Sequence, residues 1–109
     1  MSRQIPIRLR KLAGWAKLTS FEQDVLAATY SIPKGQTRSY KQVAQMAGYP
    51  RAFRAVGSVM RKNPYAPLVP CHRVIKSDGS LGRFGGGTKK KEQMLRKEGA
   101  LKDRPWPYA

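Results

Sequence analysis

The chain has 109 residues, which is enough for one small domain with a modest core. Its 22 lysines and arginines outweigh 6 acidic residues, and the formal net charge of +16 predicts a polyanionic partner, nucleic acid ahead of an anionic membrane surface. One cysteine excludes an internal disulfide, one cysteine with one histidine is too few for a structural zinc site, and no apolar run reaches the roughly 18 residues of a membrane span.

Residues 1–18 carry several basic side chains and no acid, without a clear hydrophobic period. They lack the continuous apolar core of a secretory signal, although an amphipathic organelle-targeting peptide stays open as an alternative. We expect a basic N-terminal arm that contacts DNA or is disordered, with some helix near 8–16. One domain is then predicted at 19–109.

The first firm helix is predicted from Thr19 or Ser20 to Tyr30. Ser20 and Gln23 have the three-residue spacing of a capping box, in which each side chain bonds the backbone N–H of the other residue. The segment 32–35 (IPKG) ends this helix, because proline and glycine do not continue it.

Two further helices form a helix-turn-helix pattern. The first is predicted at Tyr40–Ala47, capped by Ser39 and ended by Gly48, and the second at 49–62, with Pro50 in its first turn. A charge run is usually a solvated face, but a run of one sign across such a motif more often binds phosphates. The inward face of the second helix is predicted to be Ala52, Ala55, Val56, Val59 and Met60.

The only cysteine and the only histidine are neighbours, Cys71 and His72. A thiol is nucleophilic as its thiolate, and a nearby base or cation raises the thiolate population. The alternative is a small buried cysteine beside a structural histidine, because free cysteine is among the most buried residue types. Taken alone, the pair favours this buried interpretation.

A glycine-rich segment and one more helix complete the pattern. Four glycines in 82–87 predict a loop whose backbone approaches a ligand, or else a flexible linker, and the spacing of a phosphate loop is absent. A last helix is predicted at Thr88–Glu98, ended by Gly99, before an irregular tail. The expected fold is therefore mainly α, a single small domain with a winged-helix-like helix-turn-helix and few short strands.

The sequence PCHRV at 70–74, with Asn63-Pro64 before it and the glycine-rich loop after it, resembles the active-site region of the O6-alkylguanine-DNA alkyltransferases. The resemblance runs through 21–99 and includes SY at 39–40 and RAFRAVG at 51–57. The chain is similar to the C-terminal DNA-binding and catalytic domain of that family.

This resemblance implies roles for individual residues. Cys71 accepts the alkyl group irreversibly, His72 activates it through a water as the base, and Glu98 orients His72. Arg54 is the finger that fills the gap left by the flipped guanine. Tyr40 sits against the phosphate 3′ of the target and helps to rotate the nucleotide out. The other basic residues expected to contact DNA are Arg51, Arg61 and Lys62.

The resemblance also implies a substrate pocket. Met60 lines its floor, Asn63 ties the helix-turn-helix to the active-site strand, and the carbonyls of Cys71 and Val74 bind the exocyclic amine of guanine. Two further pocket residues depart from the family, and they are Phe84, where tyrosine is common, and Gly85, whose amide donates to O6 and where serine is common.

The predicted function is DNA repair by a monomeric suicide methyltransferase that binds the minor groove, flips O6-alkylguanine out of double-stranded DNA and transfers the alkyl group to Cys71. No metal, cofactor or membrane is expected. One alternative is an alkyltransferase-like protein that binds the lesion and signals to other repair proteins, but those relatives have another residue in place of the cysteine. A helix-turn-helix regulator of undamaged DNA is the other. The expected location is the cytoplasm, with the nucleoid, or the nucleus.

Overall fold

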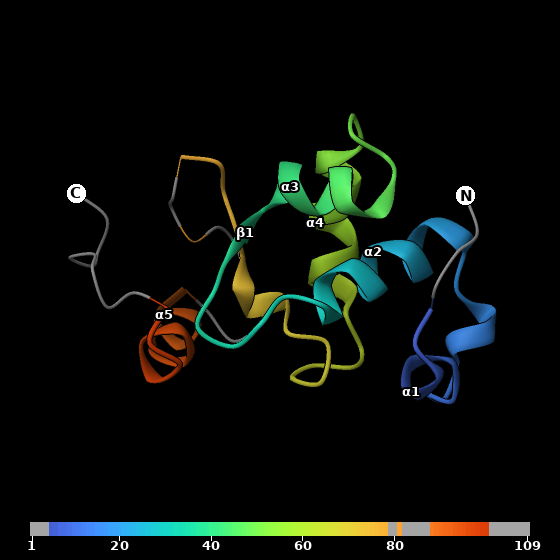
Figure 1. Cartoon of the computed structure of the whole chain (residues 1–109), viewed down its shortest axis with the longest axis horizontal. Helices are drawn as coiled ribbons and strands as arrows, with labels where there is room; N and C mark the ends of the chain where they lie inside the picture. Colours follow the sequence, from blue (N-terminus) through green and yellow to red (C-terminus); the bar gives the residue numbers. More distant parts are fainter. Residues whose placement is uncertain (1–4, 79–80, 82–87, 101–109) are drawn as a thin grey trace.

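The computed structural model describes residues 5–78, 81 and 88–100, and Figure 1 shows the course of the chain. Within these ranges no helix is long and apolar enough to cross a bilayer. The elements, with η for 3₁₀ helices, are α1 (Ile7–Arg10), η1 (Trp15–Lys17), α2 (Ser20–Tyr30), β1 (Arg38–Ser39), α3 (Tyr40–Ala47), α4 (Phe53–Lys62), η2 (Cys71–Arg73), β2 (Val74–Ile75) and α5 (Thr88–Lys97).

The predicted fold, mainly helical with few short strands, is confirmed. Two strands form the only sheet among the described residues, and they pair in parallel with Arg38 opposite Val74 and Ser39 opposite Ile75. β1 leads directly into α3, and β2 directly follows η2. The small sheet therefore joins the start of the helix-turn-helix to the segment that carries the cysteine.

Helix α2 starts at Ser20, within the predicted bounds, but its capping box lies one residue earlier than the predicted pair of Ser20 and Gln23. Thr19, not Ser20, is the N-cap, because its hydroxyl accepts from the Glu22 backbone N–H at 3.1 Å and the Glu22 carboxylate accepts from the Thr19 N–H at 2.9 Å. Both residue pairs have the spacing of a capping box, and the one that begins a residue earlier forms it.

The first helix of the helix-turn-helix forms as predicted. Ser39 caps α3 through a capping box with Gln42, and Gly48 ends it with φ of 91°, in the left-handed region that favours glycine. The second helix, α4, begins at Phe53, four residues later than expected. The Ala52 N–H donates to the Tyr49 carbonyl at 2.9 Å, so Pro50 occupies a turn for which its fixed φ is suited.

The inward face of α4 is confirmed only in part. Val56, Val59 and Met60 are buried, as predicted. Ala55 is exposed, and Ala52 is half-buried in the turn before the helix. The later start of α4 explains the position of Ala52, whereas Ala55 lies on the solvent side of the same turns that bury Val56 and Val59.

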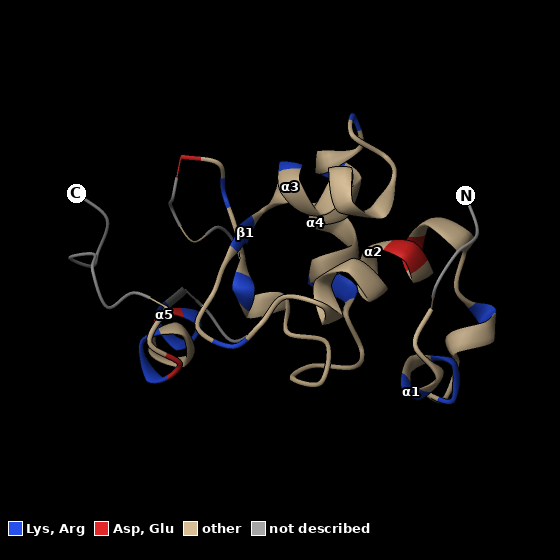
Figure 2. Cartoon of the chain, viewed as in Figure 1, with Lys and Arg blue, Asp and Glu red and all other residues tan. Residues whose placement is uncertain are grey.

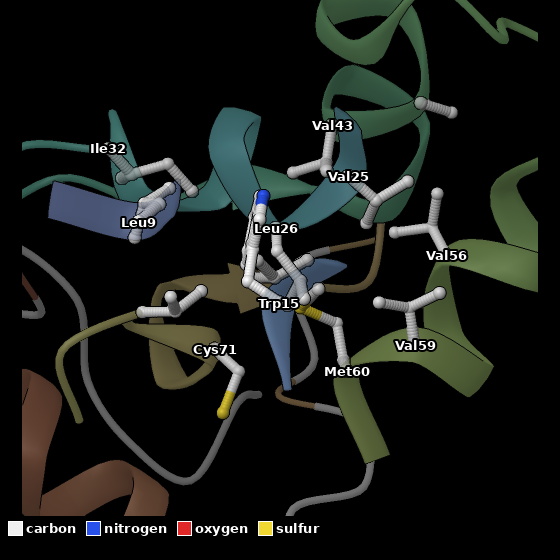
Figure 3. Close-up of a cluster of buried hydrophobic side chains, with 13 residues drawn as sticks. Leu9, Trp15, Val25, Leu26, Ile32, Val43, Val56, Val59, Met60 and Cys71 are labelled. Carbon is white, nitrogen blue, oxygen red and sulfur yellow. The ribbon is translucent and has the colours of Figure 1, made fainter. Parts of the chain in front are cut away.

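The hydrophobic core lies among α2, α3 and α4, and residues from the N-terminal segment complete it (Figure 3). Leu9 in α1 is 0% exposed and Trp15 in η1 is 4% exposed. Gly14 links these two short helices with φ of 79°. The basic segment is therefore attached to the core through two apolar side chains, and the domain boundary at residue 18 stays a prediction.

Candidate functional site

Cys71 opens η2 and packs at an edge of the core, with 8% of its surface exposed. Figure 3 shows its sulfur directed away from the other labelled side chains of the cluster. Asn63, which follows α4, donates through Nδ2 to the Val69 carbonyl at 2.8 Å and accepts from the Tyr65 N–H at 2.9 Å. Two side-chain hydrogen bonds thus attach the end of α4 to the segment that leads into Cys71.

The side chains of His72 and Glu98 meet across 26 positions of sequence. The His72 Nε2 lies 3.0 Å from the Glu98 Oε2, and His72 is 2% exposed. Burial lowers the pKa of His72, and the hydrogen bond and negative charge of Glu98 only partly offset this, so the imidazole is neutral near pH 7. An ionised carboxylate only accepts hydrogen bonds, which assigns the proton to Nε2 and leaves Nδ1 as the basic nitrogen.

Arg73 completes this group, although the sequence analysis gave it no role. Its Nε and Nη2 donate to Glu98 at 2.9 and 2.7 Å, and its Nη1 donates to the Ile32 carbonyl at 2.8 Å. Burial alone raises the pKa of Glu98, but the hydrogen bonds from Arg73 and His72 outweigh it, so the pKa is lowered. The sequence gives one signal for this pair, the excess of 22 lysines and arginines over 6 acidic residues. With so many cations in the chain, a carboxylate such as that of Glu98 is expected to pair with one of them.

Lys91 is the second residue that sequence analysis missed. It is 1% exposed, and its Nζ donates to the carbonyls of Val74 and Leu81 at 2.6 and 2.5 Å. Burial lowers its pKa to about 8, against the opposing effect of the charge of Cys71. The run Lys89 to Lys91 looks like a solvated helix start, and nothing local marks its third member as buried.

Tyr40 connects Lys91 to the helix-turn-helix. It is the first residue of α3, and the Lys91 Nζ lies 5.8 Å from the centre of its ring. Burial raises the pKa of Tyr40, and the negative charge of Cys71 raises it further. Tyr40 and Lys91 therefore both lie close enough to Cys71 for a charge on its sulfur to affect their pKa values.

The predicted pocket residues are only partly described. Met60 is 6% exposed in α4, and its sulfur lies 3.7 Å from the Thr29 hydroxyl. The Val74 carbonyl, which was expected to bind guanine, accepts from Lys91, and a carbonyl oxygen with two lone pairs can accept one more hydrogen bond. Phe84 and Gly85 lie outside the described residues.

The outer face of the helix-turn-helix is basic. Figure 2 shows lysine and arginine positions on and around α3 and α4, while the acidic positions of the described residues lie on α2, in the turn after β2, on α5 and directly after α5. The predicted DNA contacts on this face are exposed. They are Arg51, Arg54, Arg61 and Lys62.

A hollow of about 340 Å³ opens on this face. Tyr40 lines this hollow and is also within electrostatic reach of Cys71. In the described part of the chain, no group of three His, Cys, Asp or Glu side chains could hold a metal ion. The residues around the hollow are Tyr40, Lys41, Phe53, Arg54, Gly57, Lys76 and Ser77.

Comparison with known proteins gives one family. The family described as 6-O-methylguanine DNA methyltransferase, DNA binding domain, matches residues 20–100. The methylated-DNA–protein-cysteine methyltransferase of Mus musculus is 48% identical over 88 residues, which are 79% of this chain and 42% of the relative. The protein of the same name from Methanosarcina barkeri is 48% identical over 80 residues, 73% of this chain and 51% of the relative. The chain thus spans about half the length of these curated relatives.

Solved structures agree with the sequence matches. Mycobacterium tuberculosis OGT in complex with DNA has a TM-score of 0.74 and 46% identity, and the match covers 76% of this chain and 52% of that one. S. pombe Atl1, in complex with damaged DNA that contains O6-carboxymethylguanine, has a TM-score of 0.66 and 31% identity over 75% of this chain and 78% of that one. The helical fold is therefore shared with proteins whose structures have been solved in complex with DNA.

Proposed function

The chain belongs to the 6-O-methylguanine DNA methyltransferase family through its DNA-binding domain, and from that premise we propose that it repairs DNA by moving the alkyl group of O6-alkylguanine onto Cys71. The observation that supports this most is the hydrogen bond between His72 and Glu98 beside the only thiol of the chain. A merely buried cysteine would not need a neutral, oriented imidazole as its neighbour. The part of the family represented is its C-terminal DNA-binding and catalytic domain.

The reaction needs a thiolate and no cofactor. His72 takes the thiol proton at Nδ1 through a water, and Glu98 holds the ring by accepting from Nε2. The Cys71 sulfur attacks the alkyl carbon, the bond from that carbon to O6 breaks, and its electron pair leaves with guanine. Guanine regains one proton, which balances the one lost by the thiol. The thioether is stable, so each chain reacts once.

DNA binding supplies access to the lesion. A base inside a duplex is out of reach, so the nucleotide has to be extruded at a cost of a few kcal/mol. Arg54 fills the vacated place in the stack, Tyr40 guides the flanking phosphate, and the other basic residues of α4 contact phosphates in and beside the minor groove. Met60, Asn63 and Val74 shape the pocket, and Phe84 and Gly85 belong to it by resemblance. The protein acts as a monomer on double-stranded DNA, in the cytoplasm with the nucleoid or in the nucleus.

The test is transfer of label. The protein is mixed with a duplex that contains radiolabelled O6-methylguanine, and protein and DNA are then separated. We expect up to one label per chain on wild type and none on Cys71→Ala, which should still bind the duplex. Transfer to Cys71→Ala would overturn the assignment. Binding of the lesion by wild type without any transfer would instead identify a lesion-binding protein.

A further inference from the structure

Phe53 is a large apolar side chain that the fold leaves in solvent on the DNA-binding face. It is the first residue of α4 and is 37% exposed. Single exposed apolar side chains are common, so exposure alone indicates nothing. The position of Phe53 is more informative, because it precedes Arg54 and both residues line the same 340 Å³ hollow.

A cation from the other helix of the motif lies over this ring. The Lys41 Nζ, on α3, is 5.6 Å from the centre of the Phe53 ring. Such a cation–π contact restrains both side chains across the helix-turn-helix. An aromatic plane with positive charge beside it has the composition of a surface on which nucleic-acid bases stack.

The surface of α4 beside the Phe53 ring carries no side chain, because the residue there is Gly57. Gly57 lies one turn after Phe53 on the same face of α4, and a Cβ built on it meets nothing within 4 Å. Glycine within a helix is unfavourable relative to alanine, and here neither a positive φ nor internal crowding requires it. Close approach of a partner to the helix would require it.

The charges around the hollow identify that partner. Lys41, Arg54 and Lys76 surround the opening, and none of the acidic residues that the structure describes lines it. The groups that match these side chains are phosphates for the cations and a base or sugar face for the ring. A strand of DNA supplies both with the right spacing, since every nucleotide carries one of each.

We propose that Phe53 is a second duplex-opening residue, whose ring stacks against the nucleotide next to the gap that Arg54 fills, with Lys41 on the adjoining phosphate. This inference rests on the proposed function. Proteins that kink DNA from the minor groove insert apolar side chains between base steps and unstack them. A ring in this position stabilises the opened duplex, so it accelerates repair only where a base has to be flipped.

The first test compares rates of Cys71 alkylation on two substrates, a duplex with O6-methylguanine and free O6-benzylguanine. Phe53→Ala should slow the duplex reaction roughly tenfold to a hundredfold, the range expected for loss of one base–aromatic stack. It should leave the free base unaffected. Phe53→Trp should retain the wild-type rate on the duplex, and the rate of Phe53→Leu should lie between those of wild type and Phe53→Ala. Met46→Ala is the matched control, since Met46 is also an exposed apolar residue but does not line the hollow.

The second test reads unstacking directly. A 2-aminopurine next to the lesion becomes brighter when it loses its stacking partner, and Cys71→Ala prevents transfer during the measurement. The increase should be smaller or differently quenched when Phe53→Ala is added to Cys71→Ala. The inference is wrong, and the proposed function stands, if Phe53→Ala alkylates Cys71 on the duplex at the wild-type rate. The same holds if the variant reacts more slowly by the same factor on the duplex and on the free base. If wild type alkylates neither substrate, both fail.

Discussion

Arg73 and Glu98 form a two-point ion pair, with Nε 2.9 Å from Oε1 and Nη2 2.7 Å from Oε2. The same Oε2 lies 3.0 Å from the His72 Nε2. Arg73 therefore fixes the orientation of the carboxylate that in turn holds the imidazole. Its third contact, to the Ile32 carbonyl, anchors the group to the residues that follow α2.

Arg73→Lys tests this arrangement, because lysine keeps the charge but cannot form both bonds of the fork at once. We expect alkylation of free O6-benzylguanine to slow about tenfold and Arg73→Ala to slow it further, while binding to undamaged duplex changes little. Arg96→Lys is the control, since Arg96 pairs with Glu92 on the exposed side of α5. Equal rates for wild type and Arg73→Lys would show that the fork is dispensable.

The rate should depend on pH through His72. Burial lowers its pKa below 6.5, so the neutral base is retained at pH 7 and the acidic fall in rate lies below pH 6.5. Glu98 raises this pKa, so in Glu98→Gln the fall should move to still lower pH while the plateau rate drops. The measurement is the alkylation rate of free O6-benzylguanine from about pH 5 to about pH 8. An unmoved acidic limb in Glu98→Gln would separate that titration from His72.

His72→Ala should lower the plateau by about 10²- to 10⁴-fold, the usual contribution of a general base. Its thermal unfolding should be recorded beside wild type, because His72 is buried. A folded variant with an unchanged rate would make His72 structural.

The helical elements were predictable from local chemistry, and the errors have local causes. Ser39, Gln42 and Gly48 specify both ends of α3 within a few residues of sequence. Before α4, the sequence is compatible with Pro50 in the first turn of a helix or at the second position of a β-turn. The hydrogen bond from the Ala52 N–H to the Tyr49 carbonyl shows that Pro50 is in the turn.

The site was less predictable, because its polar partners are distant in sequence. Cys71 and His72 are adjacent, and resemblance supplied Glu98. Arg73 and Lys91 find their partners 25 and 17 residues away, and each looks like one more solvated cation in a basic chain. No local pattern shows which cation the fold buries.

Lys91 should make stability rise with pH. Its pKa is about 8 in the folded chain and 10.5 in the unfolded one, so between these values the unfolded chain binds more protons and the free energy of unfolding increases. The gain between pH 7 and pH 10 is about 2 kcal/mol. A neutral amine suits the site, since it has two N–H groups for the carbonyls of Val74 and Leu81.

Urea unfolding of wild type, Lys91→Met and Lys89→Met at both pH values measures this. Lys89 is exposed on the same helix, so its variant should follow wild type. The difference in stability between wild type and Lys91→Met should grow in favour of wild type as pH rises. A difference that is constant with pH would mean that Lys91 does not change its protonation there.

Trp15 should matter for stability more than for DNA binding. Its ring lies 6.0 Å from the ring of Tyr65, which belongs to the loop that precedes Cys71. The Tyr65 hydroxyl donates to the Ala13 carbonyl at 2.8 Å. Trp15→Ala should cost about 3–5 kcal/mol of unfolding free energy, as for other buried aromatic residues. Ile7→Ala, at a side chain 60% exposed, should change little. If residues 1–18 act only as a DNA-binding arm, Trp15→Ala will weaken DNA binding and leave thermal unfolding unchanged.

Arg54 should be distinguishable from its basic neighbours. Arg51, Arg61 and Lys62 are expected to act through phosphates, so replacement of any one with alanine should weaken binding to all duplexes about equally and reduce its salt dependence. Arg54 is expected to occupy the place of the flipped base, which is needed only when a stacked base has to leave.

Arg54→Ala should therefore slow Cys71 alkylation about a hundredfold on a lesion in duplex DNA, because unstacking costs a few kcal/mol and each 1.4 kcal/mol changes a rate tenfold. The loss should be smaller when the lesion lies opposite a mismatch or in a single strand, where less stacking is broken. It should vanish on free O6-benzylguanine, where nothing is flipped. Single-turnover rates for wild type, Arg54→Ala and Arg51→Ala on these substrates decide the point. An equal loss for Arg54→Ala on all of them would show that Arg54 does not enter the duplex, and it would reduce α4 to a phosphate-binding helix.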